Sequence, residues 1–149
     1  MHRRLRAAAR DRILSLMTNV TKRSRKILLA DDNDVVQLAV RSVAERCGHE
    51  VVAVMTGRTV FDRVLETKPD VVVLDIQFPD ADGRDVLAKL KTDARTAHIP
   101  VVVWSGRSLN DSDSRISIEL GAEDYVEKSD AERLIQKLDR VLLRLEQKS

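Results

Sequence analysis

The sequence is poor in the residues that build disulfides, base-stacking surfaces and zinc sites. Its 149 residues include one cysteine, Cys47, which excludes an internal disulfide and fits a reducing compartment. We expect Cys47 to be a small core residue on a helix. Aromatic residues make up only 3% of the chain, so we do not expect it to stack on single-stranded nucleic acid. The three histidines are scattered, and none follows a strand in a pattern that would bind zinc.

Long apolar runs are also missing. No run approaches the roughly 20 residues that a membrane span needs. The N-terminal segment begins with basic residues, but its apolar stretch at 13–17 is too short for the core of a signal peptide. We therefore expect a cytoplasmic protein that makes no contact with a membrane.

Charge is distributed unevenly along the chain. Residues 1–25 carry eight Lys or Arg and one Asp, a net charge of +7, whereas the remainder of the chain carries −5. We therefore predict a basic N-terminal extension over residues 1–24 and an acidic globular domain over residues 25–149. Three interpretations of the extension stay open: a poorly ordered segment, a helix that packs on the domain or on a second subunit, or a segment that binds acidic partners.

Apolar runs alternate with helical patterns through the globular domain. Strands are expected at residues 26–30, 51–55, 71–74, 99–104 and 124–127. Helices are expected at residues 34–46, 58–66, 85–91, 111–120 and about 130–147. The central strands are continuous and rich in valine, which is typical of strands covered on both faces. Five such β/α units predict an α/β fold, a doubly wound parallel sheet with helices on both sides.

Chemically active side chains follow four of the five predicted strands. The first strand is followed by Asp31 and Asp32, the third by Asp75, the fourth by Ser105 and the fifth by Lys128. Taken singly, each has an ordinary role as a helix cap, a turn residue or a surface charge. The carboxyl ends of parallel strands share one edge of the sheet, so we expect these groups to meet.

Carboxylates that lie close together repel one another, so we expect a cation to offset their charge. Mg²⁺ suits such a cluster because it prefers oxygen ligands and binds through one or two carboxylates with several waters. One carboxylate could then act as a nucleophile toward phosphorus, with the metal, Lys128 and Ser105 neutralising the phosphoryl oxygens. Asp75 would be the residue that is modified.

Four motifs resemble the receiver domain of two-component response regulators. They are ILLADDND, VVVLDIQFPDADG, IPVVVWSG and DYVEKS, in the order and at the spacing of that family, and the resemblance covers about residues 25–147. It implies a CheY-like, flavodoxin-like fold with strand order 2-1-3-4-5. It also implies that Asp75 accepts the phosphoryl group and that Asp31, Asp32, Asp75 and the backbone carbonyl of Gln77 hold Mg²⁺.

The resemblance assigns further roles around the acceptor. Ser105 matches the switch hydroxyl, Lys128 the phosphate-contacting lysine and Tyr125 the switch aromatic, expected to turn inward after phosphorylation. Gln77 and Arg107 match positions that tune dephosphorylation. The family usually has proline after its lysine, in a cis peptide, whereas Ser129 stands here. A cis bond before a residue other than proline costs about 3–4 kcal/mol, so the Lys128–Ser129 peptide is either trans or held under strain.

The function implied by the resemblance is phosphorelay signalling. A sensor histidine kinase or a phosphotransfer protein would donate its phosphoryl group to Asp75, and the altered surface would bind a downstream protein. Because the chain ends just after the last predicted helix, we expect a stand-alone, single-domain response regulator, with a homodimer as one option. Such a protein is not an enzyme in the ordinary sense, because it catalyses only its own phosphorylation and dephosphorylation.

Two other interpretations stay open. The chain fits a pseudo-receiver, a binding module that is never phosphorylated. Residues 32–36 also fit the D-x-D-x-[TV] pattern of haloacid-dehalogenase-like phosphatases, in which Asp32 would be the nucleophile and Asp34 the general acid. That second interpretation leaves Asp75 without a role.

Overall fold

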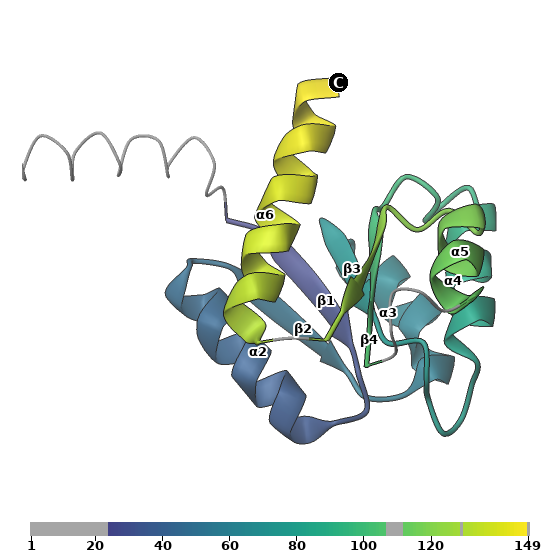
Figure 1. Ribbon diagram of the computed structural model, residues 1–149, viewed down its shortest axis with the longest axis horizontal. Coiled ribbons are helices and arrows are strands. Elements are labelled where there is room, and N and C mark those ends of the chain that lie inside the picture. The colour runs from purple at the N-terminus through teal and green to yellow at the C-terminus, as the bar shows by residue number, and fades with distance from the viewer. Residues whose placement is uncertain (1–23, 107–111, 129, 149) are drawn as a thin grey trace, which may run out of the picture.

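A computed structural model describes residues 24–106, 112–128 and 130–148 of the chain (Figure 1). The expected basic extension lies outside these residues, apart from Ser24.

Five parallel strands form one sheet. They are β1 (Lys26–Ala30), β2 (Glu50–Val54), β3 (Val71–Leu74), β4 (Val101–Ser105) and β5 (Asp124–Glu127). The sheet order is β2-β1-β3-β4-β5, and every neighbouring pair is parallel, as the sequence predicts. The second strand begins and ends one residue earlier than expected. The fourth begins two residues later, after Pro100, which has no N–H to give to the ladder.

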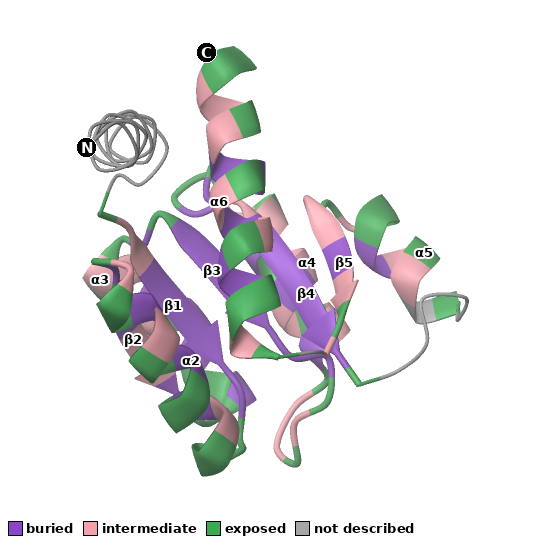
Figure 2. Cartoon of the chain, turned by 60° about the vertical axis from the view of Figure 1, so that its left-hand side comes forward, coloured by how far each residue is buried: buried purple, intermediate pink, exposed green. Residues whose placement is uncertain are grey.

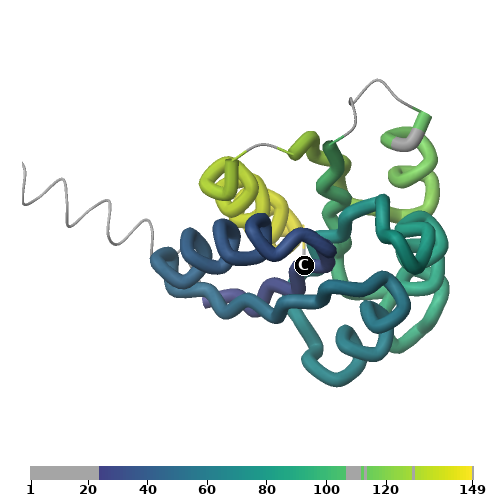
Figure 3. Tube along the Cα trace, turned by 90° about the horizontal axis from the view of Figure 1, so that it is seen from below, coloured from purple at the N-terminus to yellow at the C-terminus, as the bar shows by residue number. Residues whose placement is uncertain are grey.

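The helices cover both faces of the sheet. They are α2 (Asp34–Arg46), α3 (Val60–Thr67, after the 3₁₀ turn η1 at Gly57–Thr59), α4 (Gly83–Thr92), α5 (Ser112–Glu119) and α6 (Ala131–Lys148). Helices α2 and α6 lie side by side on one face, and α3, α4 and α5 lie on the other (Figures 1 and 3). This arrangement confirms the doubly wound α/β fold.

The sheet is the buried centre of the molecule. All residues of β3 and β4 are buried, which explains their uninterrupted valines (Figure 2). Two apolar clusters flank it. One joins the sheet to α3 and α4, and the other joins it to α2 and α6. No helix within the described residues is long and apolar enough to cross a membrane.

Helix α2 packs on the sheet largely through the face expected from the sequence. The predicted stripe is Val36, Ala39, Val40 and Val43, and the structure buries Val40 and packs Val36 and Val43 against the core. Ala39 is exposed instead, and Gln37 and Ala44 are buried on this face. The expectation for Cys47 is also wrong in detail: Cys47 caps the C-terminal end of α2 and is half-buried against the core.

Candidate functional site

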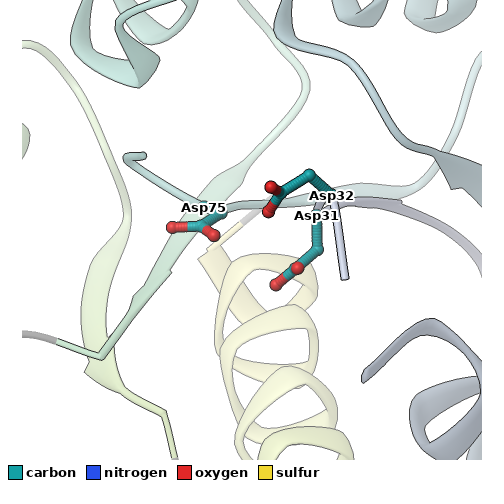
Figure 4. Close-up of side chains that lie close together, drawn as sticks. All are labelled: Asp31, Asp32 and Asp75. Atoms are coloured by element: carbon teal, nitrogen blue, oxygen red, sulfur yellow. The ribbon is translucent and has the colours of Figure 1, made fainter. Parts of the chain in front are cut away.

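Three carboxylates meet beyond the carboxyl ends of β1 and β3. Asp31, Asp32 and Asp75 each offer an oxygen, and these oxygens lie within 4.8 Å of one another (Figure 4). The sheet register explains the meeting. Ala30 pairs with Leu74, so the next residues of both strands, Asp31 and Asp75, leave the sheet together. The predicted acidic cluster is therefore present.

The turns after these strands orient two of the carboxylates. The backbone N–H of Asn33 donates to Oδ1 of Asp31 at 2.9 Å, and the N–H of Gln77 donates to Oδ1 of Asp75 at 3.0 Å. Each aspartate thus closes a local turn on the residue two positions ahead. The same turn at both strand ends leaves Oδ2 of each aspartate available to a shared partner.

That partner is Lys128, at the end of β5. Its Nζ lies 2.7 Å from Oδ2 of Asp31 and 3.2 Å from Oδ2 of Asp75. Its backbone N–H donates to the carbonyl of Ser105 at 2.7 Å, which ties the ends of β4 and β5 together. The expected lysine therefore reaches the acidic cluster from the end of the edge strand β5.

Burial and charge oppose each other in this cluster. Burial raises the pKa of the Asp75 carboxyl above its usual value, although the Gln77 N–H and the Lys128 ammonium pull the pKa down. Burial lowers the pKa of Lys128, but its contacts with Asp31 and Asp75 outweigh burial and raise it. Three carboxylates around one ammonium leave a surplus of negative charge.

The donor set fits a hard divalent cation such as Mg²⁺. All three side chains present carboxylate oxygens, the ligands that Mg²⁺ prefers. Oδ2 of Asp31 is buried and lies 2.7 Å from the Lys128 ammonium, so a cation bound here would share this oxygen with Lys128. Asp32 is exposed, which leaves the cluster open to solvent on one side.

The loop after Asp75 is held from two directions. The carboxylate of Asp80 accepts the backbone N–H groups of Gly57 and Arg58, at 2.9 and 3.0 Å. Gly83 begins α4 so close to the acceptor that an added Cβ would lie 2.6 Å from the carbonyl oxygen of Asp75. Only glycine fits there, which accounts for its place in the motif. Gln77 is exposed within this loop.

The two predicted switch residues, Ser105 and Tyr125, are both buried on the neighbouring strands β4 and β5. Ser105 is the last residue of β4 and is 1% exposed. Tyr125 is 6% exposed and packs in the apolar cluster on the α3 and α4 side. Tyr125 is thus buried in this structure, and its movement after phosphorylation stays a prediction. Its hydroxyl is buried and has no hydrogen-bond partner in the described part of the chain.

Two expectations fall outside the described residues. Arg107, expected to tune dephosphorylation, is one. The Lys128–Ser129 peptide, whose cis or trans state the sequence leaves open, is the other.

Sequence reasoning missed Gln37 of α2. Its side-chain amide is buried and donates to backbone carbonyls at the ends of β1 and β2. A signal was available, because Gln37 lies three residues before Val40 and seven before Ala44, on the buried face of the helix. A polar residue on that face must find buried partners.

A family model for the response regulator receiver domain matches residues 27–139. The chain belongs to this family. The strand order is therefore the one that the family resemblance implies. The acidic cluster and Lys128 lie at the strand ends where the four motifs place them. The phosphatase alternative, which needs Asp34 as a general acid, is not retained. Asp34 is the exposed first residue of α2 in a receiver fold.

Three known proteins illustrate the family relationship. The transcriptional regulatory protein AfsQ1 of Streptomyces coelicolor is 31% identical over 79% of this chain and 51% of its own length. The polar-differentiation response regulator DivK of Brucella ovis is 29% identical over 70% of this chain and 85% of its own. The solved Mn²⁺-bound form of the response regulator Rcp1 is 29% identical, with a TM-score of 0.64, over 82% of this chain and 91% of that one. The receiver thus spans about half of AfsQ1.

Proposed function

We propose that this receiver accepts a phosphoryl group on Asp75 from a sensor histidine kinase or a phosphotransfer protein, with Mg²⁺ as cofactor. One observation carries the proposal: Asp31, Asp32 and Asp75 converge from two strand ends, and Lys128 pairs with two of them. The Mn²⁺-bound form of the relative Rcp1 supports a divalent cation. Donors of this kind work in the cytoplasm, so we propose that location for the receiver.

The residues of the cluster divide the chemistry of transfer. An oxygen of Asp75 attacks phosphorus, a P–O bond forms, and the P–N bond to the donor imidazole breaks, with the electron pair left on that nitrogen. Asp31, Asp32, Asp75 and the carbonyl of Gln77 would hold Mg²⁺, which when bound neutralises phosphoryl oxygens as charge builds on them. Lys128 and the hydroxyl of Ser105 lie at strand ends next to Asp75 and would bind the transferred group.

The donor protein would dock on the exposed N-terminal half of α2. Val35 and Leu38 are 71% and 70% exposed, one turn apart, and lie directly after the Asp31–Asp32 turn. Met55, 40% exposed, follows β2 at the same edge of the sheet. Large apolar side chains this exposed and this close to a reaction site suit a partner surface that brings its own apolar residues.

Phosphorylation would be read out through Lys128 and β5. Adding phosphate oxygens at Asp75 changes what Lys128 pairs with, and Lys128 lies on the rim of a hollow of about 770 Å³ between β5 and α6. Tyr125, Arg133 and Lys137 line the same hollow. We propose that a downstream protein, or a second copy of the chain, recognises this surface. Gln77 and Arg107 stay proposed as residues that tune how long the phosphorylated state lasts.

Labelling from a small-molecule donor tests the proposal. Wild-type protein mixed with acetyl phosphate and Mg²⁺ should become phosphorylated, and chelating the metal should abolish the reaction. Asp75→Asn should take up no label, whereas Asp82→Asn, a carboxylate change in the same loop, should label normally. Label that persists in Asp75→Asn would remove Asp75 from its role. A wild-type protein that takes no label from any donor would favour the pseudo-receiver interpretation.

The docking surface is tested by comparing two donors. Leu38→Glu should slow transfer from a phosphorylated histidine protein by about tenfold or more, because a buried charge weakens an apolar contact. Labelling by acetyl phosphate should stay unchanged. Ile118→Glu, an equally drastic change at an exposed apolar residue of α5, is the matched control and should alter neither rate. Equal slowing by both donors would place the defect in the site rather than in docking.

A further inference from the structure

The side chain of Gln37 joins three backbone carbonyls at the edge of the sheet that carries the acidic cluster. The two N–H groups of its Nε2 are shared among three carbonyl oxygens, those of Leu29 at 2.9 Å, Asp31 at 3.0 Å and Val54 at 3.2 Å. Two of these acceptors belong to the end of β1 and its first following residue, and the third ends β2. Gln37 is only 7% exposed, so water cannot easily replace its amide.

The bond to Asp31 matters most for the site. The carbonyl of Asp31 and the N–H of Asp32 belong to one planar peptide unit, so holding the carbonyl also sets the direction in which Asp32 leaves the strand. The other side of Asp31 is tied to the same place, because its N–H donates to the carbonyl of Val54 at 3.0 Å. Gln37 shares that Val54 carbonyl.

The two acidic residues depend on this peptide to different degrees. The Asp31 side chain is buried and anchored by its own turn to Asn33 and by Lys128. The Asp32 side chain is exposed, so the backbone decides where its carboxylate stands. An error in the plane of the Asp31–Asp32 peptide would therefore move Asp32 away from Asp31 and Asp75.

We propose that Gln37 is a positioning residue for the divalent cation: its amide holds the Asp31–Asp32 peptide so that both carboxylates face Asp75. This inference rests on the proposed function only in taking the acidic cluster to bind Mg²⁺. Gln37 is not among the residues that would hold the cation or the phosphoryl group. Its effect passes through the backbone to residues that do, and outer partners of this kind typically change metal affinity by about 10–100-fold.

Substitutions of Gln37 distinguish a role in positioning the Asp31–Asp32 peptide from a role in the stability of the fold. Gln37→Met keeps the length of the side chain and removes the amide donors. Gln37→Asn keeps the amide but shortens the reach by one methylene, and it serves as the milder variant if Gln37→Met does not fold. Val40→Ala is the matched control, because Val40 is fully buried on the same helix face, one turn further from the site.

Two readouts are made on each protein, both without any phosphoryl donor. The first is the Mg²⁺ dissociation constant, followed by the fluorescence of Trp104. Trp104 is the chain's single tryptophan, and its ring lies 5.6 Å from Nζ of Lys128. The second is the rise in melting temperature that saturating Mg²⁺ produces, which measures binding to the folded state.

The expected result is a split between the variants. Gln37→Met and Gln37→Asn should weaken Mg²⁺ binding by about tenfold or more and shrink the Mg²⁺-induced rise in melting temperature. Val40→Ala should melt at a lower temperature but bind Mg²⁺ like the wild type. Wild-type affinity in a folded Gln37 variant, or equal weakening in Val40→Ala, would overturn the inference. A wild-type protein that binds no Mg²⁺ would instead count against the proposed function.

Discussion

Charged side chains are arranged differently at the two ends of the central sheet. At the amino ends of the strands, charged groups have matched partners. Arg25 forms an ion pair with Glu146, and the carboxylate of Asp70 accepts the backbone N–H of Lys26 at 2.7 Å. At the carboxyl ends, three carboxylates lie close together, and Lys128 pairs with two of them, Asp31 and Asp75. The first arrangement fastens β1 to its neighbours, whereas the second keeps a surplus of negative charge.

We interpret the amino end as serving stability and the carboxyl end as serving function. Charges paired inside one fold gain little beyond offsetting their own desolvation, so the amino end needs no further partner. Like charges gathered at one place cost stability, and a fold keeps them only where a ligand offsets them. This difference can be tested by substituting residues at each end and measuring stability, Asp75 labelling and Mg²⁺ binding.

Removing the ammonium of Lys128 should have the largest effect. Lys128→Met leaves the buried carboxylates of Asp31 and Asp75 without a counter-charge, and we expect the free energy of unfolding to fall by about 3 kcal/mol without metal. Mg²⁺ should restore part of this loss. Lys137→Met, which breaks the half-exposed pair with Asp124, should cost less than about 1 kcal/mol and should not respond to Mg²⁺. Denaturant titrations with and without Mg²⁺ measure both.

Two glycines give the next contrast. Gly83→Ala would press a Cβ against the backbone of Asp75 and Ile76, so we expect it to cost about 2–3 kcal/mol and to reduce labelling of Asp75. Gly48, near the amino ends, has open space around it but a φ of +84°. Gly48→Ala should therefore cost about 1 kcal/mol, for backbone reasons alone, and leave labelling intact. Equal labelling in both variants would show that the acceptor loop tolerates displacement.

At the amino ends, Arg25→Met should cost about 1–2 kcal/mol of unfolding free energy, because it removes the partly buried ion pair with Glu146. The Mg²⁺ dissociation constant, measured by Trp104 fluorescence, should not change. A weaker Mg²⁺ affinity in this variant would contradict the separation of the two ends.

The smallest effect on stability should come from Asp32→Asn. Asp32 is exposed, so we expect the unfolding free energy without metal to change by less than about 0.5 kcal/mol, with a gain if it changes at all. Mg²⁺ affinity should nevertheless fall by about tenfold, because one carboxylate ligand is lost. Calorimetric titration with Mg²⁺ checks the second point, and an unchanged affinity would take Asp32 out of the ligand set.

The sequence alone predicted the acidic cluster because a simple geometric rule governs it. Parallel strands end at one edge, so the residues after β1 and β3 had to be neighbours once the strands were placed. The parallel sheet with helices on both faces followed from the alternation of apolar runs and helical patterns, whereas the order of the strands was implied by the family resemblance.

Other features depend on contacts that no local pattern encodes. On α2, Val36, Val40 and Val43 pack on the core as expected, but the buried Gln37 was missed because apolar periodicity does not mark a polar residue as buried. The simultaneous pairing of Lys128 with Asp31 and Asp75 depends on how far β5 lies from β1 across the sheet. The start of β4 after Pro100 is set by a missing donor rather than by hydropathy.

Crystals grown with Mn²⁺ in place of Mg²⁺ test the central claim most directly, because Mn²⁺ can be located by its anomalous scattering. We predict one strong peak between the carboxylates of Asp31, Asp32 and Asp75, and its loss in crystals of Asp31→Asn. A peak elsewhere on the molecule, or carboxylates that remain paired with Lys128 and bind no metal, would contradict the account.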